Sequence, residues 1–349
     1  MGKRVRGANE GSSQDVPSIT PLRVAIIGGG LSGLACAIAL QKITRSDIIK
    51  SITVYERDKQ FTDRRQGFGL TLTNNRRGPL HDLGVLDECI ALNCPSTCHY
   101  VFSPDGGILG YYGRAFKDSD EDKTYDSSRV GNLRIPRQML RRLLLEKLSE
   151  DTVQWGHRLI GYTENGKDGE ITLEFEGGKE VTADLVIGAD GFHSSVRQLK
   201  DSLSSSPPSP LLPSPAPAPR YMGICVILGL SSLQHPLVNE RGFYVLDGTH
   251  RLFVMPFQRA PQLTMWQLSF SGLDATAALS FKTLSPSALL ALALEKTSAW
   301  FPTVSQLIGA TALEEVWGTA LCDRPPMTPR PRQYTSRVIV MGDACKSLA

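Results

Sequence analysis

Three glycines and one glutamate have the residue types and spacing of a dinucleotide-binding site. Gly28, Gly30 and Gly33 form the pattern G-x-G-x-x-G, and Glu56 stands 23 residues after the last glycine. The first glycine permits a sharp turn, the second lets a diphosphate approach the backbone, and the third lets a helix pack close to the preceding strand. A carboxylate at Glu56 can accept hydrogen bonds from both hydroxyls of an adenosine ribose. The pattern therefore predicts binding of an adenine dinucleotide.

The segments around these residues are typical of a βαβ unit over residues 22–56. Residues 24–27 form a continuous apolar run, as expected for a parallel strand covered on both faces, and residues 52–55 predict the next strand. Residues 31–43 predict the connecting helix, whose free amide groups and positive dipole end would face the diphosphate.

Two further glycine–aspartate pairs follow apolar runs. Asp190 and Gly191 follow a run that predicts a buried strand, and Gly342 and Asp343 follow the last apolar run of the sequence. Ligands of open α/β sheets bind at the carboxyl ends of the strands. Both pairs are therefore candidate parts of the same site.

Three arginines are less specific signals. Arg64 and Arg65 precede the glycine pair Gly67 and Gly69, where they could face phosphates or a second anionic cofactor, or could simply be solvated. Arg137 falls in the first turn of a predicted helix, where a cation is unfavourable for the helix dipole. A nearby anion explains its presence, and a solvated helix face is the alternative.

Composition excludes several classes of protein. The 349 residues carry a formal net charge of +3 with scattered basic residues, which does not indicate a nucleic-acid partner. The apolar runs are too short to cross a bilayer, and no secretory signal opens the sequence. Seven cysteines predict reduced thiols and a cytoplasmic location. Cys89, Cys94 and Cys98 lack a C-x-x-C pair, so no metal site is predicted.

The sequence predicts an α/β fold with two main domains. Helices are predicted at 77–90, at 134–149 with entry after Pro136, and at 287–300, and hairpins are predicted at 100–115 and 171–182. After the proline-rich stretch, alternating strands at 221–228, 242–246, 252–257 and 263–270 predict a mainly antiparallel sheet. The expected organisation is a disordered arm at 1–21, a Rossmann-like domain at 22–200 whose segment 97–125 could join the second domain, a proline-rich insert at 204–220, a substrate domain at 221–335, and a returning strand at 336–349.

These motifs, in this order, resemble the FAD-dependent monooxygenases related to para-hydroxybenzoate hydroxylase, from about Leu22 onward. The resemblance implies that the glycine motif and Glu56 bind the ADP part of FAD and that Gly69 lies in a flavin-proximal segment. It also implies that Arg137 lies near the cofactor, that Asp190 and Gly191 serve both FAD and NADPH, and that Asp343 contacts the ribityl chain.

The resemblance further implies that NADPH or NADH reduces FAD and that an oxygen atom from O₂ is transferred to an organic substrate, aromatic or polycyclic. The cofactor carries this chemistry, so no catalytic side chain is predicted. Absence of a second glycine motif and of a redox cysteine pair disfavours a disulfide or NAD(P)H oxidoreductase. An oxidase or dehydrogenase that releases hydrogen peroxide is a further possibility.

The sequence departs from the family pattern after Asp343. A histidine and a glycine-rich turn that opens a helix over the flavin are expected there, but the sequence continues only through Cys345 to Ala349. The helix would stabilise negative charge on the reduced flavin. We therefore expect weak FAD binding and little hydroxylase activity, and the alternative function is a truncated, non-catalytic fragment or pseudoenzyme.

Overall fold

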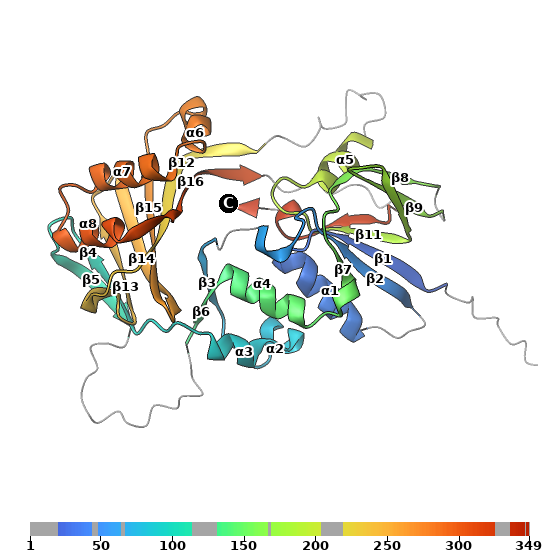
Figure 1. The fold of residues 1–349 in the computed structure, drawn as a ribbon, viewed down its shortest axis with the longest axis horizontal. Coiled ribbons are helices and arrows are strands. Elements are labelled where there is room, and N and C mark those ends of the chain that lie inside the picture. Colours follow the sequence, from blue (N-terminus) through green and yellow to red (C-terminus); the bar gives the residue numbers. More distant parts are fainter. Residues whose placement is uncertain are drawn as a thin grey trace, which may run out of the picture.

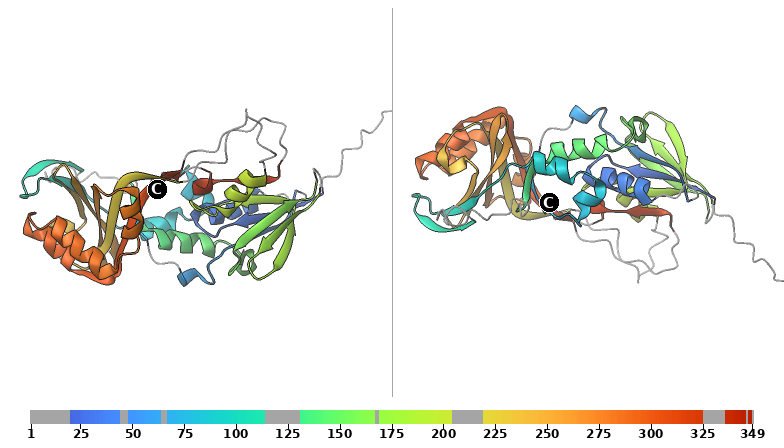
Figure 2. Two further views of the ribbon diagram at one scale, coloured as in Figure 1. Left: turned by 90° about the horizontal axis from the view of Figure 1, so that it is seen from above. Right: turned by 90° about the horizontal axis from the view of Figure 1, so that it is seen from below.

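A computed structural model describes residues 20–43, 48–63, 67–113, 131–166, 169–203, 219–324, 336–345 and 347–348. The predicted arm, most of the proline-rich insert, and Arg64 and Arg65 lie outside these residues. Figures 1 and 2 show two units side by side along the long axis of the molecule.

The first unit is built on a five-stranded parallel sheet. Its strands, in spatial order, are β17 (Val338–Val340), β11 (Leu185–Gly188), β1 (Leu22–Ile27), β2 (Ile49–Tyr55) and β7 (Val153–Gln154). All described pairings within it are parallel, with Ile27 beside both Tyr55 and Gly188. The carboxyl ends of β1, β2 and β11 therefore meet at one edge.

Both faces of this sheet are covered, which explains the continuous apolar run in β1. Val24 and Ile26 pack under α1 (Leu31–Ile43) and α4 (Arg137–Glu146). Ala25 and Ile27 pack on the other side against α5 (Ser195–Leu203) and a three-stranded antiparallel sheet. That sheet contains β8 (Leu159–Glu164), β9 (Ile171–Phe175) and β10 (Lys179–Ala183). The α/β arrangement confirms the predicted βαβ unit.

The second unit is an eight-stranded sheet. Its order is β18 (Ser347–Leu348), β16 (Thr311–Arg324), β12 (Arg220–Ser231), β15 (Gln262–Ser271), β14 (His250–Arg259), β13 (Arg241–Leu246), β4 (Cys98–Phe102) and β5 (Ile108–Gly113). Its pairings are antiparallel except for β13 with β4. The mainly antiparallel sheet predicted from the alternating strands is thus confirmed, and the hairpin of β4 and β5 joins it.

One face of the eight-stranded sheet carries helices. Inward side chains of the strands form a core with α6 (Ala275–Phe281), α7 (Pro286–Lys296) and α8 (Pro302–Gly309), which Figure 1 shows on the outer side of the sheet. On the opposite face β14 contacts the two-stranded ladder of β3 (Gly69–Leu72) and β6 (Leu133–Pro136). This ladder connects the two units because β6 leads directly into α4.

Two predicted helices differ from the structure. The helix expected at 77–90 is two short helices, α2 (Pro79–Leu83) and α3 (Leu86–Ala91). Gly84 separates them with a left-handed backbone (φ +77°), a conformation that ends helices. The helix expected within 134–149 begins at Arg137, after Pro136 as predicted, but it ends at Glu146, before the expected Ser149; residues 134–136 pair with β3.

Among the described residues no helix is both long and apolar enough to cross a membrane. Cys89, Cys94 and Cys98 are buried free thiols, and burial raises the pKa of each. In the part of the chain that the structure describes, no three His, Cys, Asp or Glu side chains gather to hold a metal ion.

Candidate functional site

A cleft of about 700 Å³ lies at the carboxyl edge of the parallel sheet. Its walls come from β1, the end of β2, the start of α4, the loop after β11, β16 and the segment after β17. Seven of the residues predicted for the site line it: Gly28, Gly30, Glu56, Arg137, Asp190, Gly191 and Asp343. Gly33 and Gly69 are not among the lining residues.

The three glycines of the first motif have different surroundings. A Cβ on Gly28 would lie 2.6 Å from the Ala189 carbonyl oxygen, and its φ of +108° also requires glycine. A Cβ on Gly33 would lie 1.9 Å from the Gly28 carbonyl oxygen, so the turn and α1 touch there. Around Gly30 no heavy atom lies within 4 Å of such a Cβ. Two glycines thus allow close packing, and the third faces open space in the cleft.

Gly69 has an ordinary environment by comparison. A Cβ there would lie 3.4 Å from side-chain atoms of Met255 and Phe257, which is normal van der Waals contact. Its amide lies 3.2 Å from the Met265 sulfur. The neighbours of Gly69, Phe68 and Leu70, line the cleft instead.

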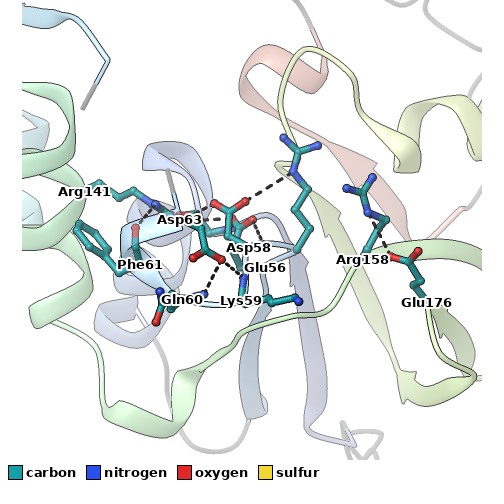
Figure 3. A network of polar contacts seen from close by, with 11 residues as sticks. Glu56, Asp58, Lys59, Gln60, Phe61, Asp63, Arg141, Arg158 and Glu176 are labelled. Carbon is teal, nitrogen blue, oxygen red and sulfur yellow. Dashed lines mark hydrogen bonds and ion pairs between the residues drawn. The ribbon is translucent and has the colours of Figure 1, made fainter. Parts of the chain in front are cut away.

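Glu56 holds the glycine-rich turn as well as lining the cleft. Its side chain is only 2% exposed, and its Oε2 accepts a hydrogen bond of 2.7 Å from the Gly29 amide. Its Oε1 accepts another of 3.0 Å from the Asp58 amide. Figure 3 shows the carboxylate at the centre of this network. Its position fixes the end of β2 to the turn after β1, a role that the motif alone does not predict.

Arg141 is the main residue of this network that sequence reasoning missed. Its side chain is 3% exposed, and its Nε donates a 2.8 Å hydrogen bond to the Gly29 carbonyl. Its Nη2 lies 3.7 Å from carboxylate oxygens of both Glu56 and Asp58. The guanidinium also packs 5.1 Å from the Phe61 ring centroid and 5.5 Å from that of Trp155. The sequence signal that could have identified Arg141 is a cationic residue between Leu140 and Leu144, two apolar residues of the predicted helix.

Arg137 lies one helical turn before Arg141 on α4. It is the first residue of the helix, is half-buried, and lines the cleft. Its backbone amide donates to the Phe68 carbonyl oxygen at 3.2 Å, which fastens the start of α4 to the loop before β3. The structure therefore brings this arginine to the cleft that contains Gly28 and Gly30.

Asp190 caps the following helix. Its Oδ2 accepts hydrogen bonds from the Ser195 and Val196 amides at 2.7 and 3.2 Å. Its Oδ1 is buried and has no hydrogen-bond partner among the described residues. Gly191, with φ +82°, makes the turn that follows. One carboxylate oxygen is thus committed to α5, and the other is the oxygen a bound ligand could contact.

Arg197 on α5 secures the segment that contains Asp343. It is fully buried, and its Nη1 donates to the carbonyl oxygens of Cys345 at 3.0 Å and Ala344 at 3.4 Å. Asp343 itself is exposed and lines the cleft. A Cβ on Gly342 would lie 2.6 Å from the Ser32 hydroxyl oxygen, so this segment also packs against the start of α1.

His193 lines the cleft and has three cationic side chains near it. Burial lowers the pKa of this histidine, and the positive charges of Arg324, Lys282 and Arg57 lower it further. The Arg324 guanidinium packs over Phe192, 5.4 Å from its centroid. A neutral imidazole surrounded by cations is an environment that favours an anionic ligand.

Comparisons with known proteins agree with this geometry. A family described as "FAD binding domain" matches residues 21–204. Aurachin C monooxygenase/isomerase of Stigmatella aurantiaca is 26% identical over 328 residues, which span 93% of this chain and 74% of that protein. FAD-dependent monooxygenase pigN of Monascus ruber is 31% identical over 178 residues, which span 51% of this chain and 39% of that protein.

The chain spans less than half the length of several curated relatives that it matches. Among solved structures, Klebsiella pneumoniae HpxO complexed with FAD and uric acid superposes with a TM-score of 0.71 at 22% identity, covering 93% of this chain and 74% of that one. At this identity the superposition shows a shared fold.

Proposed function

Because this chain belongs to the FAD binding domain family, we propose that it is an FAD-dependent monooxygenase that uses NADPH or NADH to hydroxylate an organic small molecule. The observation that carries the proposal is the convergence of Gly30, Glu56, Arg137, Asp190 and Asp343 on one cleft. These residues come from five separate segments of the chain. Surface residues of unrelated roles would not be expected to gather at the carboxyl edge of a parallel sheet.

The residues of the cleft fit FAD. Open space at Gly30 and the amide groups at the start of α1 suit a diphosphate, and Arg137 supplies a nearby cation. Glu56 and Asp343 both line the cleft. In the proposal the Glu56 carboxylate accepts hydrogen bonds from ribose hydroxyls, and Asp343 contacts the ribityl chain. The buried Oδ1 of Asp190 is a further acceptor for a bound hydroxyl or amide.

When bound, FAD supplies electron transfer from the nicotinamide and activation of O₂. The chain's residues then bind and orient. Arg141 and Glu56 keep the glycine-rich turn in its conformation, and Arg197 keeps the segment around Asp343 close to α5. We assign no side chain as nucleophile or general base in the reaction.

Two relatives, which match 93% and 51% of this chain, are named as monooxygenases. They give no support to the alternative of a non-catalytic family member. We therefore place the enzyme ahead of it. A small organic substrate and O₂ are the remaining partners in the proposal.

The test is to incubate the full chain with FAD, remove free flavin by gel filtration, and record the flavin spectrum. Oxidation of NADPH and of NADH is then measured with the yield of oxygenated product and of hydrogen peroxide. Stoichiometric flavin and coupled product are expected. Colourless protein would refute the proposal, and hydrogen peroxide with no product from any substrate tried would indicate an oxidase.

A matched pair of variants checks the cleft. Gly30→Leu places a side chain in the open space of the turn and should abolish flavin retention. Gly309→Leu, at another open glycine at the end of α8, should leave it unchanged. Equal flavin content in the two variants would show that FAD does not bind along this turn.

A further inference from the structure

Strand β5 forms one edge of the eight-stranded sheet. Among the described residues it pairs only with β4. Figures 1 and 2 show this edge at the end of the molecule away from the parallel sheet. An edge strand presents backbone N–H and C=O groups on its outer side, and a further strand can add there.

The side chains of β5 are apolar or aromatic and are exposed. The strand reads ILGYYG and carries no charge. Ile108 and Leu109 are 61% and 64% exposed, and Tyr111 and Tyr112 are 55% and 53% exposed. Natural sheets usually protect their edges with charged side chains, proline or very short strands. Strand β5 has six residues and neither charge nor proline, so its sequence favours addition of another strand.

Several other edge strands that the structure describes have such protection. In the parallel sheet, β17 has three residues and β7 has two. In the three-stranded sheet, β10 carries Lys179 and Glu180. At the other end of the eight-stranded sheet, β18 has two residues and β16 carries Glu314 and Glu315. Strand β5 is therefore the better candidate for pairing with another chain.

The apolar surface of β5 continues the core under the helices. Tyr111 lies opposite Tyr100 in register, and Ile108 lies opposite Phe102. Residues directly opposite each other in a sheet share a face. Tyr100 and Phe102 belong to the buried core, where the Phe102 ring lies 5.4 Å from that of Phe301. A partner that covers β5 must therefore bring apolar side chains as well as a strand backbone.

We propose that β5 pairs antiparallel with β5 of a second copy of this chain, across a two-fold axis. Such a contact is self-complementary, because an uncharged apolar strand meets its own copy and no like charges face each other. The pairing also closes after two copies.

Two other occupants of this edge fit less well. Pairing of β5 with the opposite end of the sheet would build an open filament, and Glu314 and Glu315 on β16 oppose it. Residues 114–130, which follow β5 in the sequence, contain the charged run KDSDEDK. A segment of that composition is a poor cover for apolar side chains.

The size of the contact predicts its strength. Each of the four large side chains is more than half exposed, so their burial removes about 100 Å² apiece, on the order of 800 Å² for the pair. Stable interfaces bury about 1,200–2,000 Å². A bulge at Leu109 also limits one-to-one pairing with β4 to Gly110–Gly113. We therefore expect a weak, reversible dimer with a dissociation constant in the micromolar range.

The dimer leaves the cleft open in both copies. The described residues that line the cleft include none from β5. Flavin retention, measured on the same samples, thus reports on the cleft separately from the association of the two copies.

The first test is sedimentation velocity of the full chain at concentrations between about 1 and 100 μM, a range that brackets a micromolar dissociation constant. We expect the sedimentation coefficient to shift from that of a monomer to that of a dimer. Leu109→Lys places a cation on both sides of the two-fold axis and should weaken the dimer about 10-fold or more. The control is Leu279→Lys, at another exposed leucine, on α6. It should leave the association unchanged.

The second test is hydrogen exchange of the wild-type chain, which does not depend on how any variant folds. Backbone amides of residues 108–113 should exchange more slowly at about 100 μM than at about 1 μM, because the dimer pairs them. Leu109→Lys should remove this difference.

Four results would overturn the proposal. They are a monomer at every concentration, equal association of wild type and Leu109→Lys, equal loss of association in Leu109→Lys and Leu279→Lys, and assemblies that grow beyond two copies. Protection of residues 108–113 that is the same at both concentrations would also overturn it, because the edge would then be covered within one chain.

Discussion

Replacement of Arg141 by methionine tests whether one buried cation maintains the glycine-rich turn. Methionine retains much of the side-chain volume and removes the 2.8 Å hydrogen bond to the Gly29 carbonyl. It also leaves the Glu56 carboxylate, 2% exposed, without the guanidinium that lies 3.7 Å away. Removing one partner of a buried ion pair costs about 3–5 kcal/mol.

The lower end of that range applies to Arg141→Met. The 3.7 Å separations are longer than hydrogen bonds, and two amides still donate to Glu56. We expect the free energy of unfolding to fall by about 3 kcal/mol. FAD affinity should fall about 10-fold or more in the protein that remains folded, because the Gly29 peptide loses its support.

The measurements are urea unfolding of the protein without added flavin and flavin fluorescence titration of the folded protein. Arg142→Met is the control, because Arg142 is exposed and packs 5.3 Å from the same Phe61 ring. It should change unfolding by about 0.5 kcal/mol or less. Identical losses for the two arginine variants would refute the reasoning.

Four other substitutions have defined outcomes. Glu56→Ala should weaken adenine-nucleotide binding by about 1.5–3 kcal/mol, and titration curves that superpose on wild type would remove Glu56 from the site. Gly28→Ala should lower the free energy of unfolding by about 3 kcal/mol through its positive φ and backbone clash, which chemical denaturation measures. The pKa of His99 is about 4 in the folded protein, against a reference value of 6.5. Between these pH values the unfolded chain binds more protons, so the free energy of unfolding should fall by about 2 kcal/mol from pH 6.5 to 4. His99→Gln should reduce this dependence of the free energy of unfolding on pH. Asp184 pairs with Arg23 and has a pKa of about 2 in the folded protein, against a reference value of 3.8. Its contribution of about 1–2 kcal/mol to the free energy of unfolding is therefore present above pH 3.8 and is lost as the pH falls to 2. An Asp184→Asn variant that unfolds in acid at the same pH as wild type would contradict this.

Local signals predicted the parallel part of the fold well. The run before Gly28 is apolar at every position because β1 is covered on both faces, and this requirement is visible within a few residues. The open space at Gly30 and the close packing at Gly33 are predictable in the same way, because both result from the single turn between β1 and α1. Such features depend on neighbours in sequence.

Other features depend on contacts that a sequence pattern does not contain. Arg141 reads as one of several arginines on a helix, and only the approach of α4 to the turn makes it a buried partner of Glu56. The stacking of His99 on Tyr112 and of Tyr244 on Phe253 requires the register of four strands drawn from residues 98–259. The pairing of residues 134–136 with β3 is a further contact of this kind, because its partner strand lies elsewhere in the sequence.

The position of β17 has a consequence for how the protein folds. This strand pairs with β11 in the parallel sheet, although five strands of the eight-stranded sheet, β12 to β16, lie between the two in sequence. Arg197 reaches the carbonyl of Cys345 across 148 positions, and Lys200 on the same helix reaches the carbonyl of Val338. Contacts of such long sequence separation form slowly, because loop closure precedes them. During synthesis the first βαβ unit would therefore emerge early and wait with one sheet edge unpaired, a state in which chaperone binding or aggregation competes with completion of the sheet.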